Sequence, residues 1–138
     1  AGLLNQNEEL ADNVQQVNQK MDRMKSDLTV LINPAFSRVI MNSTQDGIVQ
    51  QAVIYFNPSD RQVYLNTSTL PELSEDQQYQ LWALIDGQPV DAGTFDVLKD
   101  QFQQMKQFER VDAFAVTIEP KGGSEGPTLE KMQVYGEV

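Results

Sequence analysis

Side chains that could carry out acid–base chemistry are plentiful in this 138-residue chain, which holds 20 aspartates and glutamates. A general acid needs a carboxyl group that is desolvated beside a second one. The candidates instead fall in expected turns and helix starts, where carboxylates commonly serve as caps and solvated surface. We therefore expect no catalytic pair among the candidates, which are Glu72 with Glu75 and Asp76, Asp86 with Asp91, and Asp96 with Asp100.

Two missing residue types restrict the remaining chemistry. The chain contains no cysteine and no histidine, which removes disulfides, thiolate nucleophiles, imidazole zinc ligands and a conventional catalytic triad. It has no Gly-x-Ser-x-Gly motif, and no carboxylate spacing matches an EF-hand calcium loop. The sequence predicts a protein that is not an enzyme, with no catalytic residue, no cofactor and no metal site.

One glycine-rich segment, residues 121–126 (KGGSEG), invites comparison with a phosphate cradle. Such a cradle ends in Gly-Lys-Ser/Thr and leads into a helix whose N-terminus faces the anion. Here strands are expected on both sides, and Glu125 would repel phosphate. We expect a plain hairpin or linker loop, with a flexible site for a protease or a partner as the alternative.

Trp82 is the only tryptophan in the chain. An exposed indole could form the floor of a glycan or peptide site. Its neighbours Leu81, Ala83 and Leu84 are all apolar, however, which favours a buried position. We therefore expect Trp82 in the core.

The elements that must position these residues are short and extended. Residues 79–85 (YQLWALI) are largely apolar on both faces, which predicts a strand inside a two-layer structure. Asp86-Gly87 then provides a tight hairpin turn into the next strand. Turn signals recur about every 8 to 12 residues, which predicts an antiparallel β-sandwich, immunoglobulin-like in appearance. Further strands are expected at residues 38–41, 48–56, 62–65, 113–120 and 131–135.

Two short helical features are expected between these strands. Ser74 to Gln77 has the Ser-x-x-Gln form of a capping box, which predicts a single helical turn. Leu98, Phe102 and Met105 follow the spacing i, i+4, i+7, which predicts one short amphipathic helix.

Residues 1–33 differ from the rest, because apolar residues recur there every seven positions. This heptad persists for about four repeats and predicts a long α-helix that ends at Asn33-Pro34. The narrow stripe favours a coiled coil, and Asn7 at an a position suits a parallel dimer. Lys20 would face Lys25 of such a partner, so a helix that simply packs on its own domain remains the alternative. The expected self-association residues are Leu3, Asn7, Leu10, Val14, Val17, Met21, Met24, Leu28 and Leu31.

Charge and hydropathy limit the partners. The formal net charge of −10 argues against nucleic acid and anionic lipid. No apolar run approaches the roughly 20 residues of a membrane helix, and no signal-peptide pattern occurs. The chain begins with Ala1 rather than Met, so we expect a fragment or processed product that leaves room for an upstream membrane span.

Two separated segments resemble a known family. Residues 79–95 are similar to the signature YQLW…G.P…AG.F of the anti-sigma-K factor C-terminal domain, and residues 116–128 are similar to its signature VT.EP.GGS..PT. Their order and spacing agree over about the last hundred residues, a usual domain size. The resemblance implies the extracytoplasmic domain of a single-pass membrane regulator. In such proteins a separate cytoplasmic domain sequesters a sigma factor until regulated proteolysis releases it.

Two hypotheses of different classes follow. The first is a non-enzymatic, membrane-anchored sensor outside the cytoplasmic membrane, with a helix at residues 1–33 and a sandwich at residues 36–138. Its partners would be a sigma factor, a regulatory protease and a second copy of the chain. The alternative is a secreted or surface sandwich that binds glycan or peptide and oligomerises through its helix. An upstream membrane span would favour the first hypothesis, and a cleavable signal peptide the second.

Overall fold

The computed structural model describes residues 16, 18, 19, 29–67, 69–98 and 101–138. The chain divides into two compact units, Ala1–Asn33 and Pro34–Val138. In the first unit, residues 29–32 are helical, and so are residues 16, 18 and 19. The rest of the helix predicted for residues 1–33 lies outside the described residues, as do all its self-association residues except Leu31. No long N-terminal helix is therefore seen in the part of the chain that the structure describes.

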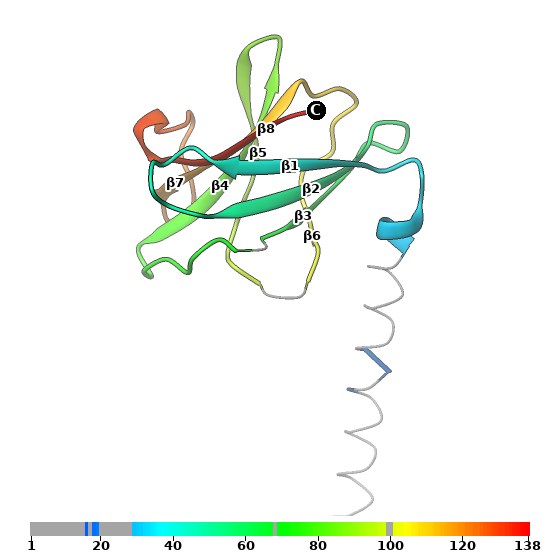
Figure 1. Ribbon diagram of the computed structural model, residues 1–138, viewed down its shortest axis with the longest axis horizontal. Helices are drawn as coiled ribbons and strands as arrows, with labels where there is room; N and C mark the ends of the chain where they lie inside the picture. Colours follow the sequence, from blue (N-terminus) through cyan, green and yellow to red (C-terminus); the bar gives the residue numbers. More distant parts are fainter. Residues whose placement is uncertain (1–15, 17, 20–28, 68, 99–100) are drawn as a thin grey trace, which may run out of the picture. The chain divides into compact units, whose positions relative to one another are not determined.

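The second unit consists of β-strands and one turn of 3₁₀-helix in its described residues (Figure 1). The predicted strands are all present, although their ends differ by a few residues from the expected ones. In chain order the elements are β1 (Ser37–Ser43), β2 (Gln51–Asn57), β3 (Gln62–Asn66), β4 (Gln77–Ile85), β5 (Gln88–Phe95), β6 (Gln103–Gln104), β7 (Ala113–Pro120), η1 (Leu129–Lys131) and β8 (Met132–Glu137).

All of these strands belong to one continuous sheet, in the order β5-β4-β7-β8-β1-β2-β3-β6. Every pairing is antiparallel, which confirms the predicted strand direction. The immunoglobulin-like sandwich of two sheets is not confirmed. β1 pairs with β8 on one side and with β2 on the other, so the two halves are joined into a sheet that curls into a half-barrel (Figure 1).

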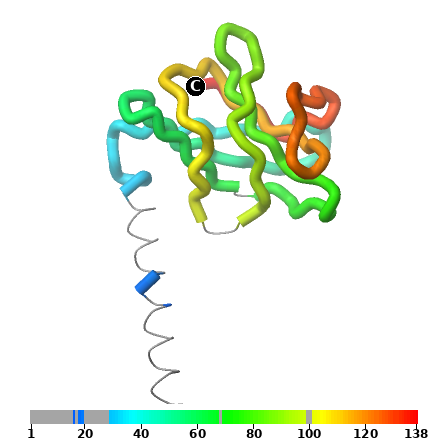
Figure 2. The backbone as a smooth tube through the Cα atoms, turned by 180° about the vertical axis from the view of Figure 1, so that it is seen from behind, coloured from blue at the N-terminus to red at the C-terminus, as the bar shows by residue number. Residues whose placement is uncertain are grey.

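The segment that carries β6 links the two end regions of the curled sheet. The Met105 N–H donates to the Val63 carbonyl on β3 at 2.8 Å, and the Lys106 N–H donates to the Ala92 carbonyl on β5 at 3.1 Å. Figure 2 shows this segment running back alongside β5. These backbone bonds cover part of both edges, which lowers the number of free groups that could pair with another chain.

The amphipathic helix predicted from Leu98, Phe102 and Met105 is wrong. The described residues of this segment are extended and include β6. Met105 is buried as its spacing suggested, but its backbone pairs with β3 instead of with its own segment. The spacing of three apolar residues is a weak local signal, and sheet pairing overrides it.

Tight turns flank β4 at both ends. At its start, the predicted helical turn is absent, because the Gln77 N–H donates to the Ser74 carbonyl at 3.1 Å in a turn that leads directly into the strand. At its end, Asp86 and Gly87 have φ values of 52° and 79°. These positive values confirm the predicted two-residue hairpin between β4 and β5.

The main core is formed by side chains on one face of the sheet. β2 alternates between buried and half-buried residues, as expected for a strand with one face inward. The two faces of β4 are used differently. Leu81 and Ala83 belong to the main core cluster, whereas Trp82 is 1 % exposed but lies on the opposite face. This second buried face of β4 positions the candidate site.

Candidate functional site

Residues 121–131, which we name the strap, connect β7 to β8 along the outward face of the sheet. The side chains that hold the strap come from β4 and from the end of β7, and they are Gln78, Gln80 and Glu119. Gln80 and Glu119 are buried even though both are polar. Because buried polar groups require partners, these side chains fix where the strap lies.

Side-chain amides of β4 hold the first half of the strap. The Gly122 N–H donates to Gln78 Oε1 at 3.0 Å, and the Ser124 N–H donates to Gln80 Oε1 at 2.8 Å. Gln80 Nε2 donates back to the Ser124 carbonyl at 3.1 Å. The Gly123 N–H donates to the Pro120 carbonyl at 2.9 Å. The N–H groups of Gly122, Gly123 and Ser124 are thus already used within the domain, which agrees with the prediction of a connecting loop.

A carboxylate holds the second half of the strap. Glu119 Oε1 accepts from the Ser124 hydroxyl at 2.9 Å and from the Thr128 hydroxyl at 2.7 Å. Glu119 Oε2 accepts from the Thr128 N–H at 2.9 Å and from the Thr117 hydroxyl at 2.5 Å. Hydrogen bonds to an ionised acceptor are stronger than neutral ones, so this carboxylate is the main anchor of the strap.

The same network reaches the only tryptophan. Trp82 Nε1–H donates to Thr117 Oγ1 at 2.9 Å, and the Thr117 hydroxyl in turn donates to Glu119. The prediction that Trp82 is buried is confirmed. A buried indole cannot serve as the exposed floor of a glycan or peptide site.

Two opposing effects act on the pKa of Glu119. Burial raises the pKa of Glu119. The hydrogen bonds from Thr117, Thr128 and Ser124 together lower it by more, so that the net pKa lies below the ordinary value of 4.5. Among the described residues Glu119 has no ion-pair partner. This carboxyl is ionised at neutral pH and is no general acid.

The glycines of the strap allow a close approach to the sheet. Gly123 has a φ of +89°, and a Cβ at this position would lie 2.8 Å from Thr94 Cγ2 and 2.9 Å from Gln80 Oε1. Only glycine fits this conformation and this space without strain. Gly123 thus serves the packing of the strap against β4 and β5, whereas a Cβ at Gly122 or Gly126 would meet no atom within 4 Å.

A shallow depression of about 550 Å³ lies between the strap and β5. Lys106 Nζ and Asp91 Oδ2 form an ion pair in it at 2.5 Å. Burial raises the pKa of Asp91, but hydrogen bonds from Lys106, Gln80 and Gly93 lower it more. The lysine of the depression is therefore already neutralised by a carboxylate.

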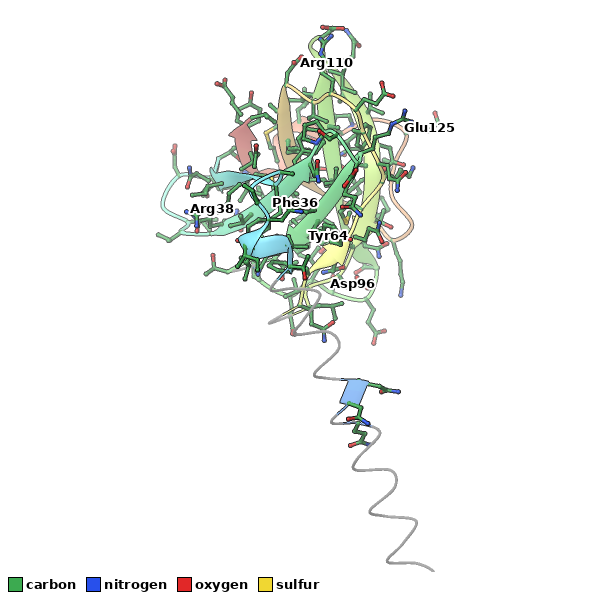
Figure 3. All side chains as sticks on the ribbon, turned by 90° about the vertical axis from the view of Figure 1, so that its right-hand side faces the viewer. Phe36, Arg38, Tyr64, Asp96, Arg110 and Glu125 are labelled. Carbon is green, nitrogen blue, oxygen red and sulfur yellow. The ribbon has the colours of Figure 1, made fainter. Side chains whose placement is uncertain are left out.

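The structure separates the candidate pair Asp86 and Asp91. Asp86 lies at the tip of the β4–β5 hairpin, where it pairs with Arg110, and Figure 3 shows Arg110 beside this tip. Asp91 pairs with Lys106 near the strap instead. Each carboxylate has its own cation, so the two do not form a catalytic dyad.

The other candidate carboxylates lie at the surface. The Ser74 hydroxyl donates to Asp76 at 2.7 Å and lowers the pKa of Asp76, the opposite of what a general acid needs. Within the described ranges, no three acidic side chains are grouped closely enough to hold a metal ion. The exposed residues are Glu72, Glu75, Asp76 and Asp96, while Asp100 lies outside the described residues.

The aromatic residues of the first signature are also structural. Tyr79 stacks on Phe95 with ring centroids 5.5 Å apart, and its hydroxyl donates to the Pro71 carbonyl at 2.6 Å. Burial raises the pKa of Tyr79 to about 12, so the phenol stays protonated. Tyr79 therefore fixes the segment before β4 and has no exposed reactive group.

Sequence reasoning did not single out Glu119 or Gln80. A signal for Glu119 was present, because it is an acidic residue in an otherwise apolar strand and shares a face with Thr117. A charge in that position requires partners if the face is covered. The cover is formed by the strap, and its position depends on the tertiary structure.

These contacts define an antiparallel β-domain whose two signature segments hold each other in place. The family model described as "Anti-sigma-K factor rskA, C-terminal" matches residues 1–134, and the chain belongs to this family. The family is one of regulatory anti-sigma factors, whose partner is a sigma factor. The match also includes the heptad region, which lies before the segment that carried the resemblance. No curated protein and no solved structure matches the chain.

Proposed function

We propose that this chain is the extracytoplasmic sensor domain of a membrane-anchored anti-sigma factor and controls the release of a sigma factor through regulated proteolysis. The match to the family over residues 1–134 carries this proposal. In this role a separate cytoplasmic domain binds the sigma factor, and the β-domain of residues 36–138 responds to conditions outside the membrane.

Three properties of the chain support a sensor rather than an enzyme. The candidate carboxylates among the described residues are exposed or paired with cations. The strap and its anchors form a hydrogen-bonded layer. The acidic surface, with a net charge of −10, suits a domain that stays off anionic lipid. Over the described residues, no helix combines the length and apolarity needed to cross a membrane.

The alternative of a surface protein that binds glycan or peptide finds no specific support. It depended on an exposed aromatic platform at Trp82, and this side chain is 1 % exposed.

Cysteine labelling in cells tests the location directly, because the chain has no cysteine of its own. Val49 is 97 % exposed, so we expect Val49→Cys in the full-length protein to react with a membrane-impermeant maleimide in intact cells. Leu65 is fully buried, and Leu65→Cys is the matched control that should react only after denaturation. Labelling of Val49→Cys only after the cells are broken would contradict an extracytoplasmic location.

The helix of residues 1–33 is proposed to pair with a second copy through its heptad seam. Replacing both Met21 and Leu28 with Asp would bury charge in this seam at a cost of several kcal/mol unless the helices separate. We expect light scattering to show a wild-type oligomer and a folded, monomeric double variant.

The matched control carries the same two charges on the outside of the helix. Gln16 and Gln19 are helical and exposed, so Gln16→Asp with Gln19→Asp should leave the oligomer intact. A monomeric wild type, together with a Met21→Asp/Leu28→Asp variant whose β-domain unfolds, would show that the helix belongs to the domain core. The proposal of a paired stalk would then be wrong.

A further inference from the structure

Glu119 is a buried negative charge that is balanced by hydrogen bonds alone. Its side chain is 1 % exposed and accepts four hydrogen bonds. Buried carboxylates in proteins are usually paired with a cation or shift toward the neutral form. In the described part of the chain, no charged residue on the surrounding segments forms an ion pair with Glu119. These charged residues are Asp76, Asp91, Asp96, Lys106, Lys121, Glu125, Glu130 and Lys131.

Three of the four hydrogen bonds to Glu119 come from the strap. They are donated by the Ser124 hydroxyl, the Thr128 N–H and the Thr128 hydroxyl. A protonated carboxyl has fewer acceptor sites and becomes a donor itself. Protonation would therefore leave donors of the strap without this partner at a half-buried position, which is unfavourable.

The backbone of the first half of the strap is held by groups other than this charge. Gly122 and the Ser124 backbone are bound by the neutral amides of Gln78 and Gln80, which do not titrate. The two halves are thus anchored by groups of different chemistry. A change in charge at Glu119 reaches the first half only through the Ser124 hydroxyl, whereas in the second half it acts on both hydrogen bonds that Thr128 donates.

We propose that the strap is a two-part latch, in which the charge of Glu119 holds residues 125–131 closed and its neutralisation releases them while β4 retains residues 121–124. The relay from Trp82 through Thr117 to Glu119 ties the indole to the state of the latch. Opening of the latch uncovers Glu119 at the end of β7. This inference does not rest on the proposed function.

The direction of the pH dependence follows from the environment of Glu119. Its folded-state pKa is lowered from 4.5, because the hydrogen bonds outweigh burial. A lowered pKa means that the stabilisation is fully present above the unfolded-state value and is lost as the pH falls through the folded-state value. We therefore expect the latch to stay closed at neutral and mildly acidic pH and to open in stronger acid.

Glu119→Gln tests the latch at constant pH, because it removes the charge and keeps the shape. At pH 7 we expect the Thr128 amide to exchange with solvent at least about tenfold faster than in the wild type, as loss of a charge-assisted bond allows local opening. The Ser124 amide, bound to Gln80, should keep its protection. Glu125→Gln is the matched control, since Glu125 is an exposed carboxylate on the same strap (Figure 3) and should change neither rate.

Thr128→Val provides a second test that keeps the carboxylate. It removes one hydroxyl donor to Glu119, so the acid transition seen in the fluorescence of Trp82 should shift to higher pH. An unchanged Thr128 exchange rate in Glu119→Gln, or an equal rise at Ser124 and Thr128, would overturn the two-part latch. If Glu119→Gln does not fold, Thr128→Val alone decides. A Thr128→Val variant whose acid transition has the same midpoint pH as that of the wild type would overturn the two-part latch.

Discussion

Trp82→Ala is expected to lower the free energy of unfolding by about 3 to 5 kcal/mol, the usual cost of deleting a large buried aromatic side chain. The indole is 1 % exposed and donates to Thr117 Oγ1 at 2.9 Å. Its removal leaves a cavity beneath the strap and deprives Thr117 of a donor. Urea denaturation followed by far-UV circular dichroism measures the change, since the variant contains no other tryptophan.

Trp82→Phe separates the two contributions to this effect. Phenylalanine keeps an aromatic ring but lacks the N–H donor, so the loss of the hydrogen bond alone should cost about 1 kcal/mol, with a further cost for the smaller ring. If Trp82→Ala lowers the free energy of unfolding by less than about 1 kcal/mol, the amount expected for loss of the hydrogen bond alone, the indole is not packed in the core.

Gly136→Ala is expected to destabilise the domain by about 1 to 3 kcal/mol, the range for overpacking a well-packed site. A Cβ at this position in β8 would lie 2.4 Å from the Ile40 carbonyl oxygen and 3.1 Å from Met41 Cα. These are backbone atoms of β1, so no side chain can rotate to make room. The β1 and β8 strands would have to move apart, and thermal unfolding should show a lower midpoint.

Gly126→Ala is the matched control for this substitution. A Cβ on Gly126 would have no atom within 4 Å, and its φ is not in the positive range. Surface substitutions of this kind usually change stability by less than about 0.5 kcal/mol. Equal midpoints for Gly136→Ala and the wild type would show that the two strands are not held as closely as described.

Much of the secondary structure could be predicted from local patterns. The two-sided apolar run at residues 79–85 became β4, and Asp86-Gly87 became the turn into β5. These predictions succeeded because strand alternation and turn chemistry are properties of adjacent residues. The segment around Met105 was predicted incorrectly, because its backbone partners are Val63 and Ala92, which lie in distant strands.

The candidate site could be predicted only in part. The lack of cysteine and histidine was readable directly from the sequence. The anchoring roles of Gln80 and Glu119 were not predicted. Gln80 meets Ser124 across a separation of 44 residues, and no local pattern encodes that contact.

The sequence by itself determined the strands other than β6, the β4–β5 turn, the family and the lack of cysteine and histidine chemistry. These follow from residue types and near neighbours, whose effects act within a few positions of the chain. Only the tertiary structure decided that the strands form one curled sheet, that β8 packs on β1 at Gly136, and that the strap covers Glu119. Such features depend on which distant backbones pair and which polar groups lose water together, and both are set by the whole fold.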